Sequence, residues 1–313
     1  MLVLSVIIVN WNVCELLEEC LYSVYSGTEF SAGQFEVIVV DNHSSDSSVE
    51  MVRRAFPQVR LIVNHKNIGF GRANNQALPF CRGRFILLLN PDTVVPQGAL
   101  DKLLAHARSR PDVGAFGCRL LNKDGSLQRW TGGSFPRLSS VASHYLFIDN
   151  LRSRFNKRAS LYLSYDADVD LDVDWVSGAC LLLRRECLTD IIFNEDFFMY
   201  GEDIELCWRL HKAGWRVVYT PIVSIIHYQG ASMKKQTDEI LLSSIKGLRS
   251  FYIMTRSRSM LWAVDILTLT GFFLRWMIYG AINLLRPRHG YDQKASSSRQ
   301  YVRLTLKAMK DSA

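Results

Sequence analysis

The chain has 313 residues and is 48% hydrophobic, which is enough for one α/β domain of about 200–250 residues and an appendage. Its net charge of +7 is uneven, because residues 244–313 hold 12 Lys and Arg against 3 Asp and Glu, which leaves −2 for the rest. This distribution excludes a uniformly basic nucleic-acid-binding protein, so we expect no nucleic-acid partner.

The first 120 residues alternate apolar runs with helical patterns. Continuous β-branched runs predict strands that are buried on both faces, at residues 4–10, 35–41, 59–64, 84–90 and 113–118. Helices are predicted between them, at residues 14–25, 46–56, 71–81 and 97–110. This rhythm predicts an α/β fold with a doubly wound, mainly parallel sheet, which binds ligands at the carboxyl ends of its strands.

The rhythm is lost over residues 122–172, where Gly, Ser, Arg and aromatic residues follow in irregular order. We expect this stretch to be a long excursion that helps to form an acceptor side. Regular structure is then predicted to return, as a strand at 173–186, a helix at 203–213 and closing strands at 215–221 and 223–229.

The last segment changes character after about residue 239. Residues 240–259 predict a basic amphipathic helix, and residues 260–288 are apolar over more than the roughly 20 residues that a membrane span needs. However, Asp265 and Arg275 interrupt this stretch, and a charge near the bilayer centre costs roughly 2.5–3.5 kcal/mol. We therefore expect a helical hairpin or helix in the membrane interface, and a helical lid on the catalytic domain is the alternative.

Seven motifs stand in a characteristic order along the chain: VIIVNWN, VIVVDNHSSDSS, NHKNIGFGRANNQAL, FILLLNPDTVV, DWVSGACLLLRRE, FFMYGEDIELCWRL and IIHYQGAS. Together they resemble the family 2 glycosyltransferases of GT-A fold, and within that family the bacterial rhamnosyltransferases of cell-wall and surface-polysaccharide assembly. The resemblance implies a glycosyltransferase domain over residues 1–238, with a nucleotide-sugar half at 1–120 and an acceptor half at 121–238. A helical, membrane-associating tail over residues 239–313 would follow.

The predicted nucleotide site lies at strand ends. The Asp41 carboxylate can accept hydrogen bonds from a pyrimidine N–H or from ribose hydroxyls, and the resemblance implies that it holds the base. A helix cap for the turn that follows is the alternative. The resemblance adds further residues to the nucleotide-sugar site: Asn10, Asn67, Gly69, Asn75, Asn90 and Asp92.

A metal site is implied by Asp92 and His227. Asp92 corresponds to the last acidic residue of the family's DxD-type motif, which reads Asn90-Pro91-Asp92 here, and His227 matches a histidine that completes the metal site in relatives. One histidine and one carboxylate, with phosphate oxygens and water, would suit Mn²⁺ or Mg²⁺. The alternatives are a turn-capping aspartate and a satisfied core histidine.

Asp203 is the predicted catalytic base, because displacement at an anomeric carbon needs a group that takes the proton of the acceptor hydroxyl. Glu202 beside it is expected to take part in catalysis and to contact acceptor hydroxyls. Trp175 and Gly178 are further expected acceptor contacts. The alternatives are a helix N-cap for Asp203 and a core position for Trp175.

The predicted function is inverting, metal-dependent transfer of a sugar, with dTDP-L-rhamnose as the preferred donor. The predicted acceptor is a lipid-linked or polysaccharide hydroxyl at the cytoplasmic face of the membrane, where the enzyme would be peripheral or monotopic. One alternative is a catalytically silent relative that acts as a membrane assembly partner. Another is a nucleotidyltransferase, although VNWNVCELL lacks the glycine-rich basic loop expected there.

Overall fold

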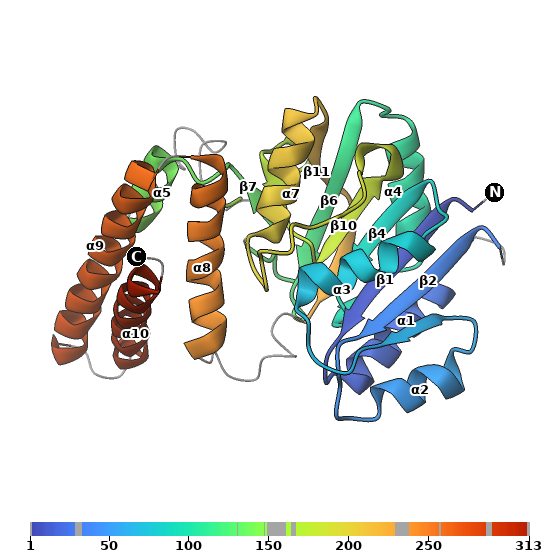
Figure 1. The fold of residues 1–313 in the computed structure, drawn as a ribbon, viewed down its shortest axis with the longest axis horizontal. Helices are drawn as coiled ribbons and strands as arrows, with labels where there is room; N and C mark the ends of the chain where they lie inside the picture. Colours follow the sequence, from blue (N-terminus) through green and yellow to red (C-terminus); the bar gives the residue numbers. More distant parts are fainter. Residues whose placement is uncertain are drawn as a thin grey trace. The chain divides into compact units, whose positions relative to one another are not determined.

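The computed structural model describes residues 2–28, 33–129, 131–146, 148, 161–163, 167–228, 238–256, 258–285 and 290–311. The chain forms two compact units, drawn in Figure 1. Unit 1 comprises Met1–Gly133, Tyr162–Phe198 and Glu202–Lys234, and unit 2 comprises Ser134–Leu161, Met199–Gly201 and Lys235–Ala313. Unit 2 therefore includes part of the expected acceptor half. Residues 149–160 of the expected excursion and residues 229–237, next to the expected domain boundary, lie outside the described residues.

Unit 1 is built on one mixed sheet. Over the described residues its strands follow the order β3-β2-β1-β4-β10-β6-β11-β5, and β8 pairs with β11. A second, two-stranded sheet pairs β7 with β9. The strands are β1 Leu4–Asn10, β2 Phe35–Asp41, β3 Arg60–Val63, β4 Phe85–Leu89, β5 Thr93–Val94, β6 Val113–Leu121, β7 Gly132–Gly133, β8 Leu171–Asp172, β9 Trp175–Val176, β10 Cys180–Arg184 and β11 Arg216–His227.

Strand direction brings several chain segments to one edge of this sheet. β3, β2, β1 and β4 are mutually parallel, as predicted, and β6 and β11 run the same way. β10 is antiparallel to both of its neighbours, β4 and β6. The carboxyl ends of β1, β2, β4 and β11 therefore lie at the same edge as the amino end of β10.

The two expected closing strands are one strand, β11. Its pairing with β6 is interrupted between Thr220 and Ser224, so that residues 221–223 have no partner on β6. Pro221 stands in this interruption, where a residue without an N–H is tolerated because no ladder bond is needed.

Helices cover the sheet because its strands are apolar on both faces. All seven residues of β1 are buried. α1, α2 and α4 supply Leu17, Met51 and Leu103 to a core cluster that also holds alternate residues of β1, β2 and β4. α3 packs on β1 and β2, and α7 packs on β6 and β11. The bounds are α1 Cys14–Ser26, α2 Ser48–Ala55, α3 Phe70–Ala77, α4 Ala99–Arg108 and α7 Glu202–Lys212, with 3₁₀ turns at Leu78–Phe80 and Arg185–Cys187.

Unit 2 is helical over its described residues, with α5 Leu138–Tyr145, α8 Asp238–Thr255, α9 Arg258–Leu285 and α10 Tyr291–Lys310. α9 packs on α10 through the stacked rings of Phe272 and Tyr301, whose centroids are 4.2 Å apart. Gly271 lets α5 approach α9, since a Cβ there would lie 2.5 Å from the Cβ of Tyr145. Within the described chain, α9 is the one helix long and apolar enough to cross a membrane by length and composition.

Candidate active site

The ends of β1 and β2 hold a buried polar pair. Asn10 and Asp41 are partners in the strand register, and Asn10 Nδ2 donates to Asp41 Oδ2 over 2.9 Å. The other carboxylate oxygen, Oδ1, accepts from the Ser44 amide over 2.9 Å. Both side chains are buried, and Asn10 Oδ1 has no hydrogen-bond partner among the described residues. Asp41 is thus held as a fixed acceptor at this edge, where the sequence predicted the nucleotide base.

The loop before α3 is shaped by asparagine side chains. Asn67 Oδ1 accepts from the Gly69 amide and from Asn42 Nδ2, each over 2.9 Å. Gly69 has a φ of +89°, and a Cβ there would lie 2.8 Å from the Phe198 carbonyl oxygen, so both conformation and space require glycine. Asn42 was not predicted from the sequence, yet its Oδ1 also accepts from the Ile68 amide over 3.0 Å.

Asn75 has different neighbours from the other predicted nucleotide residues. Its Oδ1 accepts from the amides of Ile192 and Phe193, each over 2.9 Å, and its Nδ2 donates to the Phe193 carbonyl over 2.8 Å. These bonds hold the segment before α7 against α3. A nucleotide-binding role for Asn75 stays a prediction.

The structure brings Asp92 and His227 together. β11 ends at His227, which pairs with Thr93 of β5, directly after Asp92. The His227 Nε2 atom lies 3.2 Å from Asp92 Oδ1 and 3.3 Å from Asn90 Nδ2. Both Asp92 and His227 are buried, at 5% and 8% exposure. Both side chains of the pair are therefore largely shielded from solvent, and Asn90 lies beside them.

The geometry of this pair fits a shared divalent cation. Two adjacent ligands of an octahedral ion with bonds of about 2.1 Å are about 3 Å apart, close to the 3.2 Å between Nε2 and Oδ1. Over the described residues no group of three or more His, Cys, Asp and Glu side chains is placed to hold a metal. The remaining ligands would have to come from a bound diphosphate and from water, as is usual for Mg²⁺.

The start of α7 carries two neighbouring carboxyl groups, of which Glu202 is buried and Asp203 is partly exposed. Asp203 Oδ1 accepts from the Ile204 amide over 2.9 Å, and Oδ2 accepts from the Gly178 amide over 3.3 Å. Burial raises the pKa of Asp203 to about 6. Burial, and then the neighbouring Asp203 charge, raises the pKa of Glu202 to about 8. Both shifts are upward, so the two carboxyl groups hold a proton to a higher pH than exposed carboxyl groups do.

The backbone at residues 178–179 connects the two carboxyl groups at the start of α7 to the Asp92–His227 pair. Gly178 lies two residues before β10, and the carbonyl of Ala179 accepts from the Asn90 amide over 2.9 Å. A continuous path of backbone and hydrogen bonds therefore leads from Asp203 to Asn90, which contacts His227.

Trp175 lies in β9, where it pairs with Gly133 of β7. Its side chain is buried, at 4% exposure, and the ring of Tyr162 packs on it edge to face with centroids 6.0 Å apart. Stacking of Trp175 on a sugar stays a prediction.

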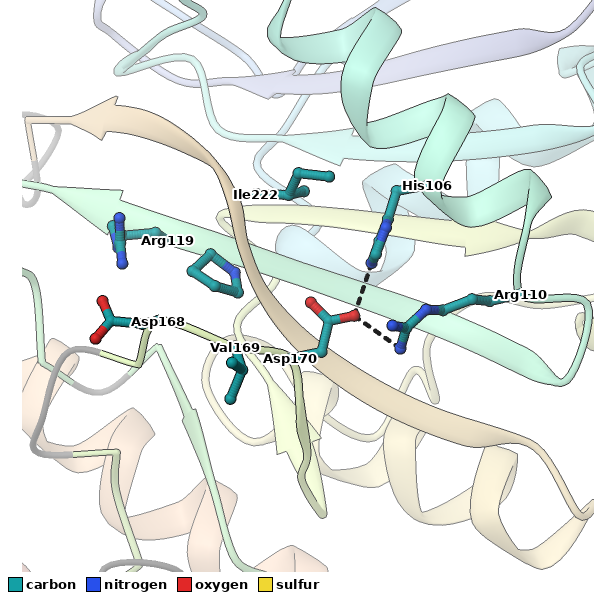
Figure 2. Close-up of a pocket in the computed structure, with 8 residues that line it drawn as sticks. His106, Arg110, Arg119, Asp168, Val169, Asp170 and Ile222 are labelled. Atoms are coloured by element: carbon teal, nitrogen blue, oxygen red, sulfur yellow. Dashed lines mark hydrogen bonds and ion pairs between the residues drawn. The ribbon is translucent and has the colours of Figure 1, made fainter.

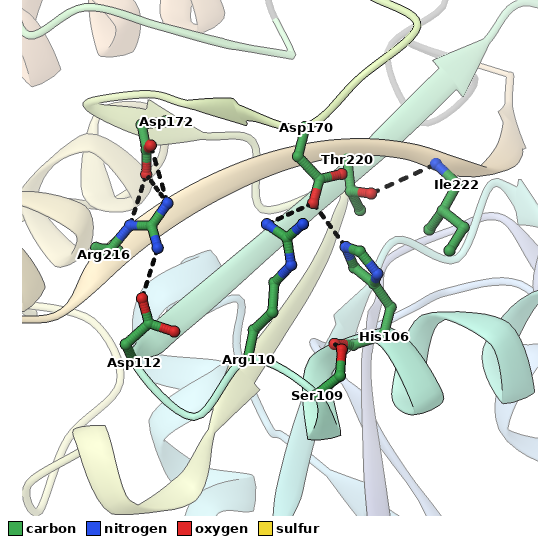
Figure 3. A network of polar contacts seen from close by, with 9 residues as sticks. All are labelled: His106, Ser109, Arg110, Asp112, Asp170, Asp172, Arg216, Thr220 and Ile222. Atoms are coloured by element: carbon green, nitrogen blue, oxygen red, sulfur yellow. Dashed lines mark hydrogen bonds and ion pairs between the residues drawn. The ribbon is translucent and has the colours of Figure 1, made fainter.

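A separate cavity of about 480 Å³ lies elsewhere in unit 1 and shares no residue with this edge site. Figure 2 shows Asp170 facing His106 and Arg110, with 2.7 Å from its Oδ2 to His106 Nε2 and to Arg110 Nη1. In Figure 3, Arg216 joins Asp172 to Asp112. These ion pairs fix Asp170 to the carboxyl end of α4 and Asp172 to Arg216 of β11, just before β9. No prediction from the sequence pointed to this network.

The sheet edge thus holds a buried carboxylate, a carboxylate–histidine pair and, beside it, two neighbouring carboxyl groups at a helix start. Residues 5–188 match the family model described as Glycosyl transferase family 2, and the chain belongs to this family. The protein is therefore a glycosyltransferase, and the resemblance drawn from the sequence motifs is confirmed.

The chain is similar in sequence to two rhamnosyltransferases and in structure to a mannosyltransferase. The N-acetylglucosaminyl-diphospho-decaprenol L-rhamnosyltransferase of Mycobacterium tuberculosis is 29% identical over 90% of this chain and 91% of its own length. The rhamnosyltransferase WbbL of Escherichia coli is 31% identical over 51% of this chain and 61% of its own. The mannosyltransferase PcManGT from Pyrobaculum calidifontis, solved with GDP-Man and Mn²⁺, has a TM-score of 0.59 at 19% identity and covers 99% of this chain and 88% of its own. This last likeness confirms the α/β fold.

Proposed function

We propose that the protein transfers a sugar, with inversion, from a nucleotide diphosphate donor to a hydroxyl of a lipid-linked or polysaccharide acceptor in cell-envelope glycan synthesis. The preferred donor is dTDP-L-rhamnose, because relatives that span most or half of this chain are named as rhamnosyltransferases. The observation that carries the proposal is Asp203, a partly exposed carboxylate with a raised pKa that is linked through Gly178 to the Asp92–His227 pair.

The chemistry assigned to Asp203 is general-base catalysis. Its carboxylate takes the proton of the acceptor hydroxyl while the acceptor oxygen bonds to the anomeric carbon and the bond to the diphosphate oxygen breaks. Attack opposite to the leaving group inverts the anomeric configuration. Glu202, which keeps its proton at neutral pH, is suited to donate a hydrogen bond to another acceptor oxygen.

The donor is assigned to the neighbouring strand ends. Asp41 accepts hydrogen bonds from the base or ribose, and the Asn67–Gly69 loop borders the same region through Asn42. A divalent cation, Mn²⁺ or Mg²⁺, held by Asp92 and His227 would neutralise charge on the departing diphosphate. The presence of Mn²⁺ in the PcManGT structure supports this assignment.

We also propose that the enzyme lies at the cytoplasmic face of a membrane as a peripheral or monotopic protein, and the polar partners of two charged residues of α9 support the membrane contact. Asp265 is buried and paired with Arg249. Arg275 donates to the carbonyls of Tyr145 and His144 over 2.7 and 2.8 Å, within the same unit. The two charges that argued in the sequence against a simple membrane span thus have partners inside unit 2.

The outward side of α9 is left apolar. Trp262, Ile266, Phe273 and Met277 recur at helical spacing and are 58%, 58%, 46% and 55% exposed. A helix with satisfied charges on one side and large apolar side chains on the other is suited to lie in the interface of a bilayer. That position would give the enzyme access to a lipid-linked acceptor.

The test of the proposed function is a donor screen. Purified full-length protein is incubated with Mn²⁺ or Mg²⁺, a panel of nucleotide sugars and a polyprenyl-diphosphate-linked acceptor, and release of nucleoside diphosphate is followed. Acceptor-dependent release with dTDP-rhamnose is expected. If nucleoside diphosphates bind but no donor is turned over, the catalytically silent assembly partner is the better description.

A further inference from the structure

Gln128 contacts His227 with both ends of its side-chain amide. Oε1 of Gln128 lies 2.9 Å from Nδ1 of His227, and Nε2 of Gln128 donates to the His227 carbonyl over 2.5 Å. The side chain of Gln128 is buried, at 3% exposure. The backbone N–H of Gln128 donates to the Leu120 carbonyl of β6 over 2.9 Å. Gln128 is thus fixed to the sheet and to one residue of the proposed metal pair.

The two contacts together determine which way the amide faces. A backbone carbonyl oxygen only accepts hydrogen bonds, so the end of Gln128 beside it has to be the NH₂ group. Oε1 is therefore the atom that faces His227 Nδ1. Because Oε1 also only accepts, Nδ1 has to carry the hydrogen.

This protonation has a consequence on the other side of the ring. In a neutral imidazole with its hydrogen on Nδ1, Nε2 presents a lone pair. That lone pair points to where Asp92 Oδ1 and Asn90 Nδ2 lie, at 3.2 and 3.3 Å. The Asn90 amide can donate to it, whereas a lone pair facing a carboxylate oxygen is repulsive until a cation lies between them.

We propose that Gln128 is a positioning residue that selects the Nδ1–H tautomer of His227 and aims Nε2 at the divalent cation shared with Asp92. The proposal rests on the metal site of the proposed function. Without Gln128, the favoured arrangement is the opposite tautomer, in which Nε2–H donates a hydrogen bond to Asp92. In that arrangement neither Nε2 nor the Asp92 oxygen is available to bind the cation. Outer-shell partners of this kind typically change metal affinity by about 10–100-fold.

The tautomer is measurable in the metal-free protein, without turnover. Two-bond ¹H–¹⁵N spectra of ¹⁵N-histidine-labelled full-length enzyme distinguish hydrogen on Nδ1 from hydrogen on Nε2. We expect Nδ1–H for His227 in the wild type and Nε2–H in Gln128→Met, which keeps the side-chain length but has no acceptor. His106, whose Nε2 lies 2.7 Å from Asp170, is an internal reference that Gln128→Met leaves unchanged.

Metal affinity gives the second readout. Mn²⁺ binding in the presence of a nucleoside diphosphate, followed by the electron paramagnetic resonance signal of free Mn²⁺, is expected to weaken about 10–100-fold in Gln128→Met. Gln128→Glu keeps an acceptor for Nδ1–H but loses the donor to the His227 carbonyl, so it is expected to keep the tautomer and to weaken Mn²⁺ binding less than Gln128→Met does. Gln58→Met, at an exposed glutamine, is the matched control and is expected to bind Mn²⁺ like the wild type.

The outcomes separate the two proposals. Hydrogen on Nε2 in the wild type, or wild-type tautomer and Mn²⁺ affinity in Gln128→Met, overturns the role of Gln128. If His227→Ala and Asp92→Ala also leave Mn²⁺ affinity unchanged, the metal site itself is wrong. If Gln128→Met does not fold, the wild-type spectrum and Gln128→Glu still decide the question.

Discussion

The backbone amide of Gly178 donates a hydrogen bond to Oδ2 of Asp203 over 3.3 Å. This bond connects the start of α7 to the amino end of β10, whose neighbour Ala179 binds Asn90 through its carbonyl oxygen. One oxygen of the proposed base is thereby fixed to the same sheet edge as the proposed metal ligands. The alternative from the sequence, a helix cap, describes the other oxygen, which accepts from the Ile204 amide. The two roles are compatible in one side chain.

Replacing Asp203 by Asn is expected to lower the rate of transfer by about 10²–10⁴-fold, because an amide of the same shape cannot take the proton of the acceptor. Binding of the donor, measured by calorimetry, should change little. Asp196→Asn makes the same change of charge at an exposed position in the segment before α7 and should keep wild-type turnover. Near-normal turnover by a folded Asp203→Asn protein would remove Asp203 from the base role.

The pH dependence of transfer follows from the two raised pKa values. A base acts when it is deprotonated, so kcat/KM should fall as the pH drops through about 6, where Asp203 gains its proton. Loss of the Glu202 proton near pH 8 should give a second fall at alkaline pH if that proton is donated to the acceptor. Because the two carboxyl groups are neighbours, the measured profile reports the titration of the pair, and Asp203 is expected to be the more acidic member. A rate that stays constant from pH 5 to pH 7 would contradict a base with a raised pKa.

Removal of metal is expected to stop turnover, and Mn²⁺ or Mg²⁺ should restore it. Asp92→Ala and His227→Ala should each weaken metal-dependent binding of the nucleoside diphosphate, measured by calorimetry with and without Mn²⁺. The control is His211→Ala, at an exposed histidine of α7. Equal affinity for the nucleotide with and without metal in the wild type would count against the site.

The apolar side of α9 is expected to bind membranes. Ile266→Lys combined with Met277→Lys should reduce binding to phosphatidylglycerol-containing vesicles by at least about tenfold, because each buried apolar side chain contributes roughly 1.5–3 kcal/mol. Co-sedimentation with the vesicles measures this. Gln293→Lys with Ser296→Lys adds the same charge at exposed positions of α10 and should bind as well as, or better than, the wild type.

Substitutions are a sharper test here than truncation before residue 240. α5 packs on α9, and the backbone of Tyr145 accepts from Arg275, so a shortened chain would lose part of the packing of unit 2. If the double lysine variant of α9 binds vesicles as tightly as the wild type, that side is not the anchor, and the helical lid is the better description. An alkaline wash adds a second measurement, since it should release an interfacial protein from membranes and leave a spanning protein in place.

The parallel part of the fold, and the polar side chains at the carboxyl ends of its strands, could be predicted because they depend on local patterns. Apolar runs of strand length that end in Asn10, Asp41 and Asn90 have few interpretations other than buried strands with polar carboxyl ends. The antiparallel insertion of β10 between β4 and β6 could not be predicted, because an apolar run carries no direction. The two expected closing strands are one strand because Pro221, which suggests a strand end, lies where the pairing with β6 is interrupted and needs no N–H.

Side-chain roles that depend on distant contacts were also beyond prediction. Gln128 lies in an irregular stretch, and nothing local to it indicates that it meets His227. Asn75 shows a second difficulty, because it was predicted to bind the nucleotide and its amide contacts residues 192–193. An asparagine in a helix looks the same in the sequence whether its amide faces a ligand or the protein backbone. The family resemblance assigned such positions by order along the chain, which cannot distinguish these two uses.

The interruption of β11 after Thr220 determines to which face of the sheet each later side chain of the strand points. Because side chains alternate between the two sheet faces, the three unpaired residues 221–223 decide which face His227 presents to Asp92. Deleting one codon there would turn the imidazole to the opposite face while the strand before it could keep its place in the core. If the proposed metal site is correct, the length of this short segment is under a constraint as strict as the identity of the ligands, and natural insertions or deletions there would mark family members without such a site.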